Sequence, residues 1–135
     1  MRTPLAEAMA RVGDRWTLPV VDALLDGPRR FSELAEAVDG IAPNILTQRL
    51  RDLERDALVV ARPYSHRPRR VTYELTEDGR DLATAVRALA EWGARHGGGA
   101  EPARHAACGT PLEVRWFCPT CQEAVEAADE DLHFA

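Results

Sequence analysis

Residues 43–75 read PNILTQRLRDLERDALVVARPYSHRPRRVTYEL, and this stretch decides the fold. Its first part repeats leucine at the three- and four-residue spacing of a helix that buries one face: Leu46, Leu50 and Leu53. Pro43 suits the first helical position, where its missing N–H leaves nothing unsatisfied. The opposite face carries polar residues that can form hydrogen bonds: Asn44, Thr47, Gln48, Arg51 and Arg55. The spacing therefore predicts an amphipathic helix whose outward stripe is almost free of acids.

Two β-rich runs follow this helix, LVVARPY (58–64) and VTYEL (71–75), and SHRPRR (65–70) lies between them. Valine, threonine and tyrosine favour strands, so the pattern predicts a hairpin with a basic, proline-containing loop at its tip. Residues 44–73 contain seven arginines against three acids. Local charge decides which surface meets phosphate, so this part of the chain is the candidate for contact with nucleic acid.

The residues on either side of this stretch predict further helices. An apolar stripe predicts a first helix that ends at Gly13: Leu5, Ala8, Met9 and Val12. A nearly all-apolar run at about 16–25 predicts a buried second helix, with Pro19 in its first turn, and residues 31–38 a short third one. From Thr76 onward we expect one long last helix. The predicted fold class is mostly α with a small β-hairpin wing (α+β), in a winged helix-turn-helix architecture.

In such an architecture the polar-faced helix enters the DNA major groove, and the hairpin contacts phosphates or the minor groove. We expect groove contacts from Asn44, Thr47, Gln48 and Arg51, with Arg55 as a further DNA-binding residue of the same stripe. For the backbone or minor groove we expect Arg62, Arg67, Arg69 and Arg70, with Arg29 and Arg30 as weaker phosphate candidates. Taken singly, a polar stripe is usually a solvated face and an arginine run a solubilising loop; their order along the chain favours double-stranded DNA.

The net charge of −5 is unevenly distributed. Residues 1–96 hold 15 of the 17 basic and 15 of the 22 acidic residues, so residues 97–135 carry the whole excess of negative charge. Every basic residue apart from histidine is arginine, which suits phosphate but also follows from a GC-rich genome. No signal peptide and no run of membrane-spanning length is present, so we expect a cytoplasmic protein with reduced cysteines and no membrane partner.

Four motifs resemble the HxlR-type regulators, which are relatives of the MarR-like winged helices: GDRWTL (13–18), LLDGPRRFSEL (24–34), ILTQRLRDLE (45–54) and YELTEDGRDL (73–82). The resemblance covers roughly residues 4–93. It implies a homodimer built from the first and last helices, with each subunit's fourth helix in a half-site and the half-sites roughly 34 Å apart. It also implies a transcriptional regulator, which we take to be a repressor, and not an enzyme.

The chain departs from the family's pattern at three positions. Family members commonly carry a cysteine directly before a proline at the start of the first helix, but here Thr3 precedes Pro4. Thiol sensing at that position is therefore excluded. Ala42 stands where the family has a capping serine, and Pro19 replaces an aliphatic residue. The predicted DNA-binding face is unaffected by any of these changes.

A cysteine- and histidine-containing module follows the resembling part. His105-x2-Cys108 and Cys118-x2-Cys121 flank an alternating apolar run, as two zinc-ligand turns joined by a hairpin would. We expect these four residues to bind one structural Zn²⁺, because about 30 residues bury too little apolar surface to hold themselves. The alternatives are a metal-free tail, with Cys118 and Cys121 bridged or packed on the last helix, and a redox or metal sensor. His133 could also replace His105 as a ligand.

These patterns divide the chain into a winged helix-turn-helix domain at 1–96, a linker at 97–104, a zinc-ribbon-like module at 105–125 and an acidic tail at 126–135. The competing function is a winged-helix protein-interaction or metal- and redox-sensing module that acts through the ribbon. A metalloenzyme is disfavoured, because four protein ligands fill the zinc tetrahedron. A small-molecule effector is a further expected partner, and Met9, Trp16 and Trp92 are its candidate cavity residues, although core packing explains them equally well.

Overall fold

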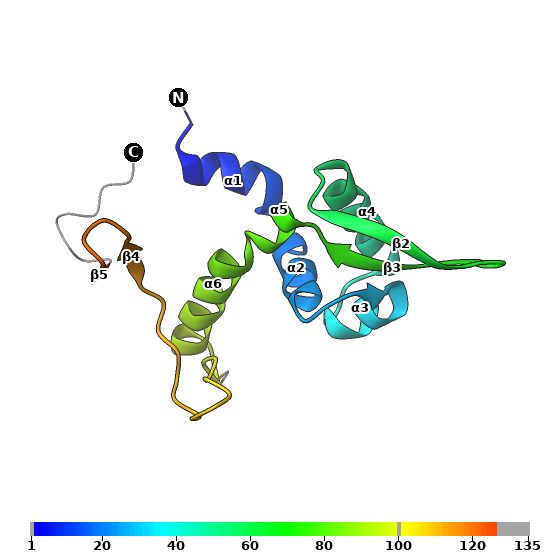
Figure 1. The fold of residues 1–135 in the computed structure, drawn as a ribbon. Helices are drawn as coiled ribbons and strands as arrows, with labels where there is room; N and C mark the ends of the chain where they lie inside the picture. Colours follow the sequence, from blue (N-terminus) through cyan, green and yellow to red (C-terminus); the bar gives the residue numbers. More distant parts are fainter. Residues whose placement is uncertain (1, 100, 127–135) are drawn as a thin grey trace. The chain divides into compact units, whose positions relative to one another are not determined.

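The computed structural model describes residues 2–99 and 101–126. The chain forms two compact units, which divide between Arg87 and Ala88. The first unit contains four helices before its β-hairpin: α1 (Pro4–Val12), α2 (Thr17–Leu25), α3 (Phe31–Ala37) and α4 (Pro43–Arg55). Its sheet is a three-stranded antiparallel one, and the β-hairpin extends away from the helices (Figure 1). The predicted fold class, a winged helix-turn-helix of mostly helical content, is confirmed.

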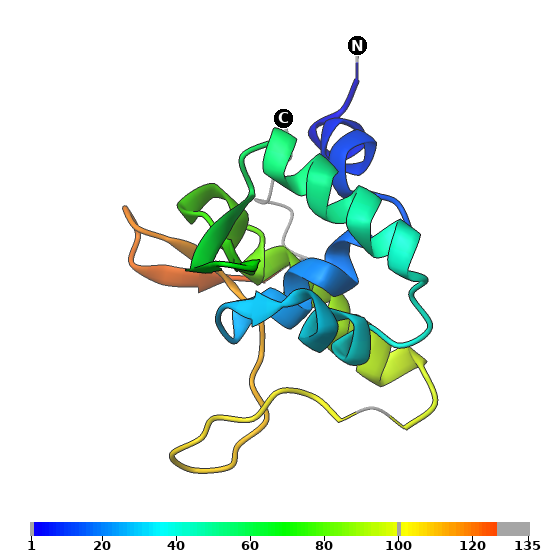
Figure 2. The same ribbon diagram turned by 90° about the vertical axis from the view of Figure 1, so that its right-hand side faces the viewer.

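The core of the first unit is built around α2, which packs against α3, α4 and the sheet (Figures 1 and 2). Val20 and Val21 of α2 are fully buried, as are the predicted inward residues of α4. Val86 of the last helix closes the same core. By contrast, the apolar stripe of α1 is mostly exposed, since Val12 is its one buried residue. The prediction of an apolar stripe was correct, but the other described residues of the first unit leave most of it exposed.

Side chains and prolines fix the helix ends. The Thr3 hydroxyl accepts a hydrogen bond from the Ala6 N–H at 3.2 Å and so caps α1. Pro19 is the third residue of α2, within its first turn as predicted. Pro43 opens α4 without a side-chain cap, since Ala42 has no hydroxyl to offer. Because these features are local, the positions of the helix ends can be predicted from the sequence.

The hairpin is longer than the sequence indicated. Strands β2 (Val59–His66) and β3 (Arg69–Leu75) pair to the end, with Ser65 opposite Arg70 and His66 opposite Arg69. The prediction of a loop at 65–70 was therefore wrong for most of its residues, because the Arg67-Pro68 turn is tight enough for the ladder to continue. A two-residue strand, β1 (Arg29–Arg30), pairs with the other edge of β3 and was not predicted.

The predicted single long helix after Thr76 is two helices, α5 (Glu77–Arg80) and α6 (Ala83–His96). The Thr76 hydroxyl accepts from the Gly79 N–H at 3.1 Å and donates to the Ala57 carbonyl at 2.6 Å. Gly79 itself packs against the chain before β2, since a Cβ there would lie 2.1 Å from the Leu58 carbonyl oxygen. These contacts pin α5 to the start of β2, so the chain turns before α6 begins.

The second unit begins within α6 and contains a two-stranded antiparallel hairpin of β4 (Trp116–Cys118) and β5 (Glu123–Val125). An isolated bridge joins Arg104 to Pro111. None of the described residues between 101 and 126 is buried. Over the described part of the chain, every helix falls short of the length and apolar content that crossing a membrane requires.

Candidate nucleic-acid interface

The outward face of α4 carries the polar stripe that the sequence predicted. Asn44, Gln48, Arg51 and Arg55 are exposed, whereas the leucines of the opposite face are at most 2% exposed. Thr47 is only half-buried, and its hydroxyl donates to the Pro43 carbonyl at 2.9 Å. The helix therefore offers amide and guanidinium groups to a groove, and its threonine hydroxyl is already engaged.

Asp52 lies beside this stripe and binds two of its members. The Gln48 side-chain amide and an Arg55 guanidinium N–H both donate to the same Asp52 oxygen, each at 3.0 Å. Asp52 also lies 3.4 Å from the guanidinium of Arg49. Arg51 differs from its two arginine neighbours on α4, since it forms no ion pair within 4 Å in the described part of the chain. Arg51 is thus the guanidinium of α4 that is ready to meet a base edge or a phosphate.

Arg49 supports the polar face from behind, a role that the spacing of outward side chains does not indicate. Its guanidinium lies 3.5 Å from the Asp14 carboxylate, which accepts from the N–H groups of Trp16 and Thr17 at the start of α2. Partial burial raises the pKa of Asp14, but hydrogen bonds from the Thr17 hydroxyl and these N–H groups, together with Arg49, outweigh it and lower the pKa. Arg49 therefore joins α4 to the N-terminus of α2 and sets the position of the polar face.

The wing presents three exposed arginines at its tip: Arg67, Arg69 and Arg70. None of them forms an ion pair within 4 Å with a residue in the described ranges. Arg62 lies further back on β2 and pairs with Glu74 of β3. The wing tip thus provides unpaired positive charge, whereas Arg62 is partly neutralised within the sheet.

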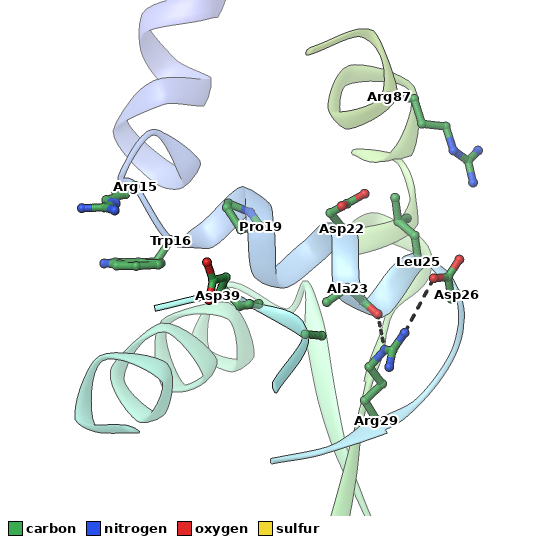
Figure 3. A pocket seen from close by; sticks show the side chains of 12 residues that line it. Arg15, Trp16, Pro19, Asp22, Ala23, Leu25, Asp26, Arg29, Asp39 and Arg87 are labelled. Carbon is green, nitrogen blue, oxygen red and sulfur yellow. Dashed lines mark hydrogen bonds and ion pairs between the residues drawn. The ribbon is translucent and has the colours of Figure 1, made fainter. Parts of the chain in front are cut away.

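The two arginines of β1 differ in accessibility. The Arg29 guanidinium donates to the Ala23 carbonyl at 2.6 Å and lies 3.7 Å from Asp26, as Figure 3 shows. Arg30 is exposed and pairs with Glu33 at 2.8 Å. Hydrogen bonding to Glu33 raises the pKa of Arg30, and the same bond lowers that of Glu33. Arg29 is held against the helix that precedes it, so Arg30 is the better placed of the two to reach a phosphate.

A cavity of about 550 Å³ lies beside Arg29 and Trp16, with Asp22 and Arg87 also in its lining (Figure 3). Met9 lines a different cavity, next to Arg49. Trp92 stacks on His96, with ring centroids 4.6 Å apart. Within the first unit, Met9 and Trp16 therefore line two separate cavities.

The four candidate zinc ligands form two pairs. His105 Nδ1 lies 3.4 Å from Cys108 Sγ, and Cys118 Sγ accepts from the Cys121 N–H at 3.5 Å. Across residues 2–99 and 101–126, no group of three or more metal-ligating side chains is assembled. The three cysteines are free thiols. His133 and the acidic tail beyond residue 126 lie outside the described residues.

The surroundings of these thiols change their acidity in different directions. Hydrogen bonding between Cys108 and Thr110, chiefly with the hydroxyl and then with the backbone, lowers the pKa of Cys108, and the hydrogen bond with His105 adds to this effect. The N–H groups of Cys121 and Thr120 lower the pKa of Cys118, and the neighbouring Cys118 in turn raises that of Cys121. The surroundings therefore favour the thiolate forms of Cys108 and Cys118, and the thiolate is the form that binds a metal.

Comparison with known proteins matches residues 11–100 to the HxlR-like helix-turn-helix family model. An uncharacterized HTH-type transcriptional regulator of Mycobacterium tuberculosis is 39% identical over 127 residues, which cover 91% of this chain and 80% of the relative. The HTH-type transcriptional regulator YodB of Bacillus subtilis is 32% identical over 88 residues, covering 65% of this chain and 79% of that protein.

Solved structures of regulators are also similar to this chain. The redox regulator HypR in its oxidized form is 34% identical with a TM-score of 0.64, covering 68% of this chain and 95% of that one. A structure from Pseudomonas aeruginosa is 33% identical with a TM-score of 0.67, covering 90% of this chain and 85% of that one. This match and the mycobacterial one are long enough to extend beyond residue 100, where the family model ends.

Proposed function

The chain belongs to the HxlR-like helix-turn-helix family of transcriptional regulators, and on that premise we propose that it represses transcription as a homodimer bound to a specific site on double-stranded DNA. The observation that carries this proposal is the pairing state of its arginines. Arg51 on α4 and the three arginines of the wing tip are exposed and without an ion pair in the described part of the chain. Their charge is therefore available to DNA without the loss of an internal contact.

The groups that read the base sequence are those of the outward face of α4. Arg51 suits a guanine edge, which accepts two guanidinium hydrogen bonds, and Asn44 suits an adenine. Gln48 and Arg55 take part by exchanging their bonds to Asp52 for bonds to DNA. Thr47 offers its methyl group rather than its hydroxyl, which already bonds to Pro43.

The groups that bind the phosphates are those of the wing and of β1. Arg67, Arg69 and Arg70 contact the backbone or the minor groove beside the α4 site. Arg30 is a further phosphate contact, and Arg62 joins them only when its pair with Glu74 opens. We assign no contact to Arg29, whose guanidinium is bound to Ala23 and Asp26.

A second copy of the chain explains two exposed apolar stripes. On α1, Leu5 and Met9 are 70% and 48% exposed; on α6, Leu89 and Trp92 are 55% and 58% exposed. Large apolar side chains grouped on a helix face mark an interaction surface, and a two-fold axis is the usual arrangement of two identical chains. Such a dimer presents two α4 helices to half-sites roughly 34 Å apart.

This protein acts by occupying DNA and performs no chemical reaction. We place it in the cytoplasm, where a regulator meets its operator. The cavity beside Trp16 is where a small-molecule effector would bind, between α2 and the segment that precedes α4. The zinc-ribbon-like module predicted at 105–125 is a separate proposal, and DNA binding by the first unit does not depend on it.

Recovery of bound fragments from sheared genomic DNA tests the proposal. We expect an inverted repeat whose half-sites are about one helical turn apart, located at a promoter. A transcription assay from that promoter then gives the sign of regulation, and repression is expected. Recovery of fragments with no shared motif would contradict sequence-specific binding.

A further inference from the structure

Two short turns in the second unit share one backbone geometry. In the first, the Gly109 N–H donates to the His105 carbonyl at 2.7 Å, and Gly109 has a φ of 73°. In the second, the Gln122 N–H donates to the Cys118 carbonyl at 2.8 Å, and Gln122 has a φ of 57°. In each turn the first and fourth residues carry side chains that bind metals: His105 with Cys108, and Cys118 with Cys121.

The second turn has a left-handed residue that is a glutamine, Gln122, and not the glycine that usually occupies this conformation. Among the described residues, Gln122 and Ala57 are the two non-glycine positions with positive φ. Such a conformation is strained for a glutamine, and strained backbone concentrates at functional sites. The chain therefore maintains this turn although its residue type does not favour it.

Both turns are closed by antiparallel pairing on their two sides. Arg104 pairs with Pro111 around the first turn, and Cys118 pairs with Glu123 around the second. The His105 N–H also donates to the Thr110 carbonyl at 2.9 Å. Each metal-ligating pair thus lies at the end of its own small hairpin.

The side chains within the first pair already have the separation of metal ligands. His105 Nδ1 lies 3.4 Å from Cys108 Sγ. A nitrogen at about 2.0 Å and a sulfur at about 2.3 Å from one tetrahedral Zn²⁺ are about 3.5 Å apart. In the second pair the Cys121 N–H points at Cys118 Sγ, which it stabilises as an acceptor.

Between residues 101 and 126, the structure shows no hydrophobic core that could hold these turns. No described residue of 101–126 is buried, and Leu112, Val114, Trp116 and Phe117 are all exposed. A segment of this size that buries so little apolar surface needs another source of stability, and a structural metal ion supplies it.

We propose that the two turns close on a single Zn²⁺ ion, bound by His105, Cys108, Cys118 and Cys121. Nine residues separate Cys108 from Cys118, and 112–115 among them belong to no helix or strand. Rotation about this segment brings the two hairpins together and completes the tetrahedron. On binding, the three thiols each release a proton, and the neutral imidazole supplies the fourth ligand.

Cobalt titration of the full-length, reduced, chelator-treated protein tests this proposal. We expect saturation at one Co²⁺ per chain, with the intense visible bands of a tetrahedral site, a sulfur-to-metal charge-transfer band, and loss of both when Zn²⁺ is added. His105→Ala and Cys118→Ser should each abolish the tetrahedral bands, and His96→Ala, outside the turns, should leave them unchanged. His105→Cys should restore them with stronger charge transfer.

DNA binding by each variant, measured alongside, shows that the first unit is folded and keeps this test separate from the proposed function. The weak spectrum of octahedral cobalt, or binding without saturation, would overturn the zinc site. So would tetrahedral bands that survive His105→Ala and disappear in His133→Ala, because the first turn would then not be a ligand pair. Two chains per cobalt ion would equally contradict closure within one chain.

Discussion

The Arg49 guanidinium lies 3.5 Å from the Asp14 carboxylate, so the helix that faces DNA is tied to the N-terminus of the buried helix α2. Both side chains are about two-thirds buried or more. Asp14 lies in the GDRWTL motif and Arg49 in the ILTQRLRDLE motif, two of the four on which the family resemblance rests. The relationship gives these motifs a physical role: they orient the polar face of α4.

Replacement of Asp14 should therefore destabilise the first unit. Asp14→Ala removes the acceptor of the Trp16 and Thr17 N–H groups and leaves Arg49 without one of its partners, for a loss of about 1–2 kcal/mol in the free energy of unfolding. Asp14→Asn keeps the acceptor oxygen and should lose less. Urea denaturation measures both values, and equal losses in the two variants would mean that the ion pair, not the cap, provides the stability.

The same residue predicts a pH dependence. The pKa of Asp14 is lower in the folded chain than its ordinary value, so its ionised form stabilises the fold. That contribution is present above the ordinary aspartate pKa of about 4 and is lost as the pH falls through the lower, folded pKa. The stability difference between the wild type and Asp14→Asn should thus shrink on acidification below about pH 4. If the stability difference between the two proteins does not change below about pH 4, the charge of the Asp14 carboxylate is not involved.

Asp52 should lower the affinity for DNA. It accepts hydrogen bonds from Gln48 and Arg55 and adds a negative charge beside the groove-facing stripe. Asp52→Asn should raise the affinity for non-specific DNA severalfold, with a steeper dependence on salt. Glu36→Gln, which removes an exposed charge from α3, is the matched control and should change little. Fluorescence anisotropy on random duplexes measures both, and weaker binding by Asp52→Asn would instead make Asp52 a residue that positions Gln48.

An acidic residue in either exposed apolar stripe should dissociate the dimer. Leu89→Asp places a charge where a second copy of α6 is expected. The free energy needed to desolvate that charge exceeds the free energy that the apolar contact provides. Leu112→Asp makes the same change at a leucine of similar exposure that lies outside both helices, and it should leave assembly intact. Sedimentation equilibrium measures the oligomeric state of both variants. A wild-type chain that sediments as a monomer would contradict the proposed dimer.

The positions of α1 to α4 could be predicted from the sequence because their signals are local. Leucines at helical spacing, with Pro43 at the first helical position, place the start of α4 to the residue. The break between α5 and α6 could not be predicted, since it depends on a hydrogen bond from Thr76 to Ala57, nineteen residues earlier. The short strand β1 was missed for a similar reason: two residues carry no periodicity, and only pairing with Tyr73 and Thr72 defines them.

The candidate site divides in the same way. Which side chains lie on the outer face of α4 follows from helical spacing, and the exposure of Arg51 and Gln48 agrees with it. Which of them are already bonded does not follow, because Asp52 and Glu74 take their partners through side-chain geometry that a spacing pattern does not contain. Sequence spacing thus located the surface, and the structure separated its free guanidinium groups from its paired ones.

The dependence of DNA affinity on salt, measured on the recovered operator and on a scrambled duplex, tests the central claim most directly. Each lost phosphate contact lowers the slope of log K against log[salt] by about 0.9, so Arg69→Ala/Arg70→Ala, which removes four contacts from a bound dimer, should reduce it by about 3.6 on both duplexes. Arg51→Ala should cost about 1–3 kcal/mol on the operator and far less on the scrambled duplex. Arg115→Ala, at an exposed arginine of the second unit outside this surface, should match the wild type. Slopes and operator preference that are the same in all four proteins would contradict binding through α4 and the wing.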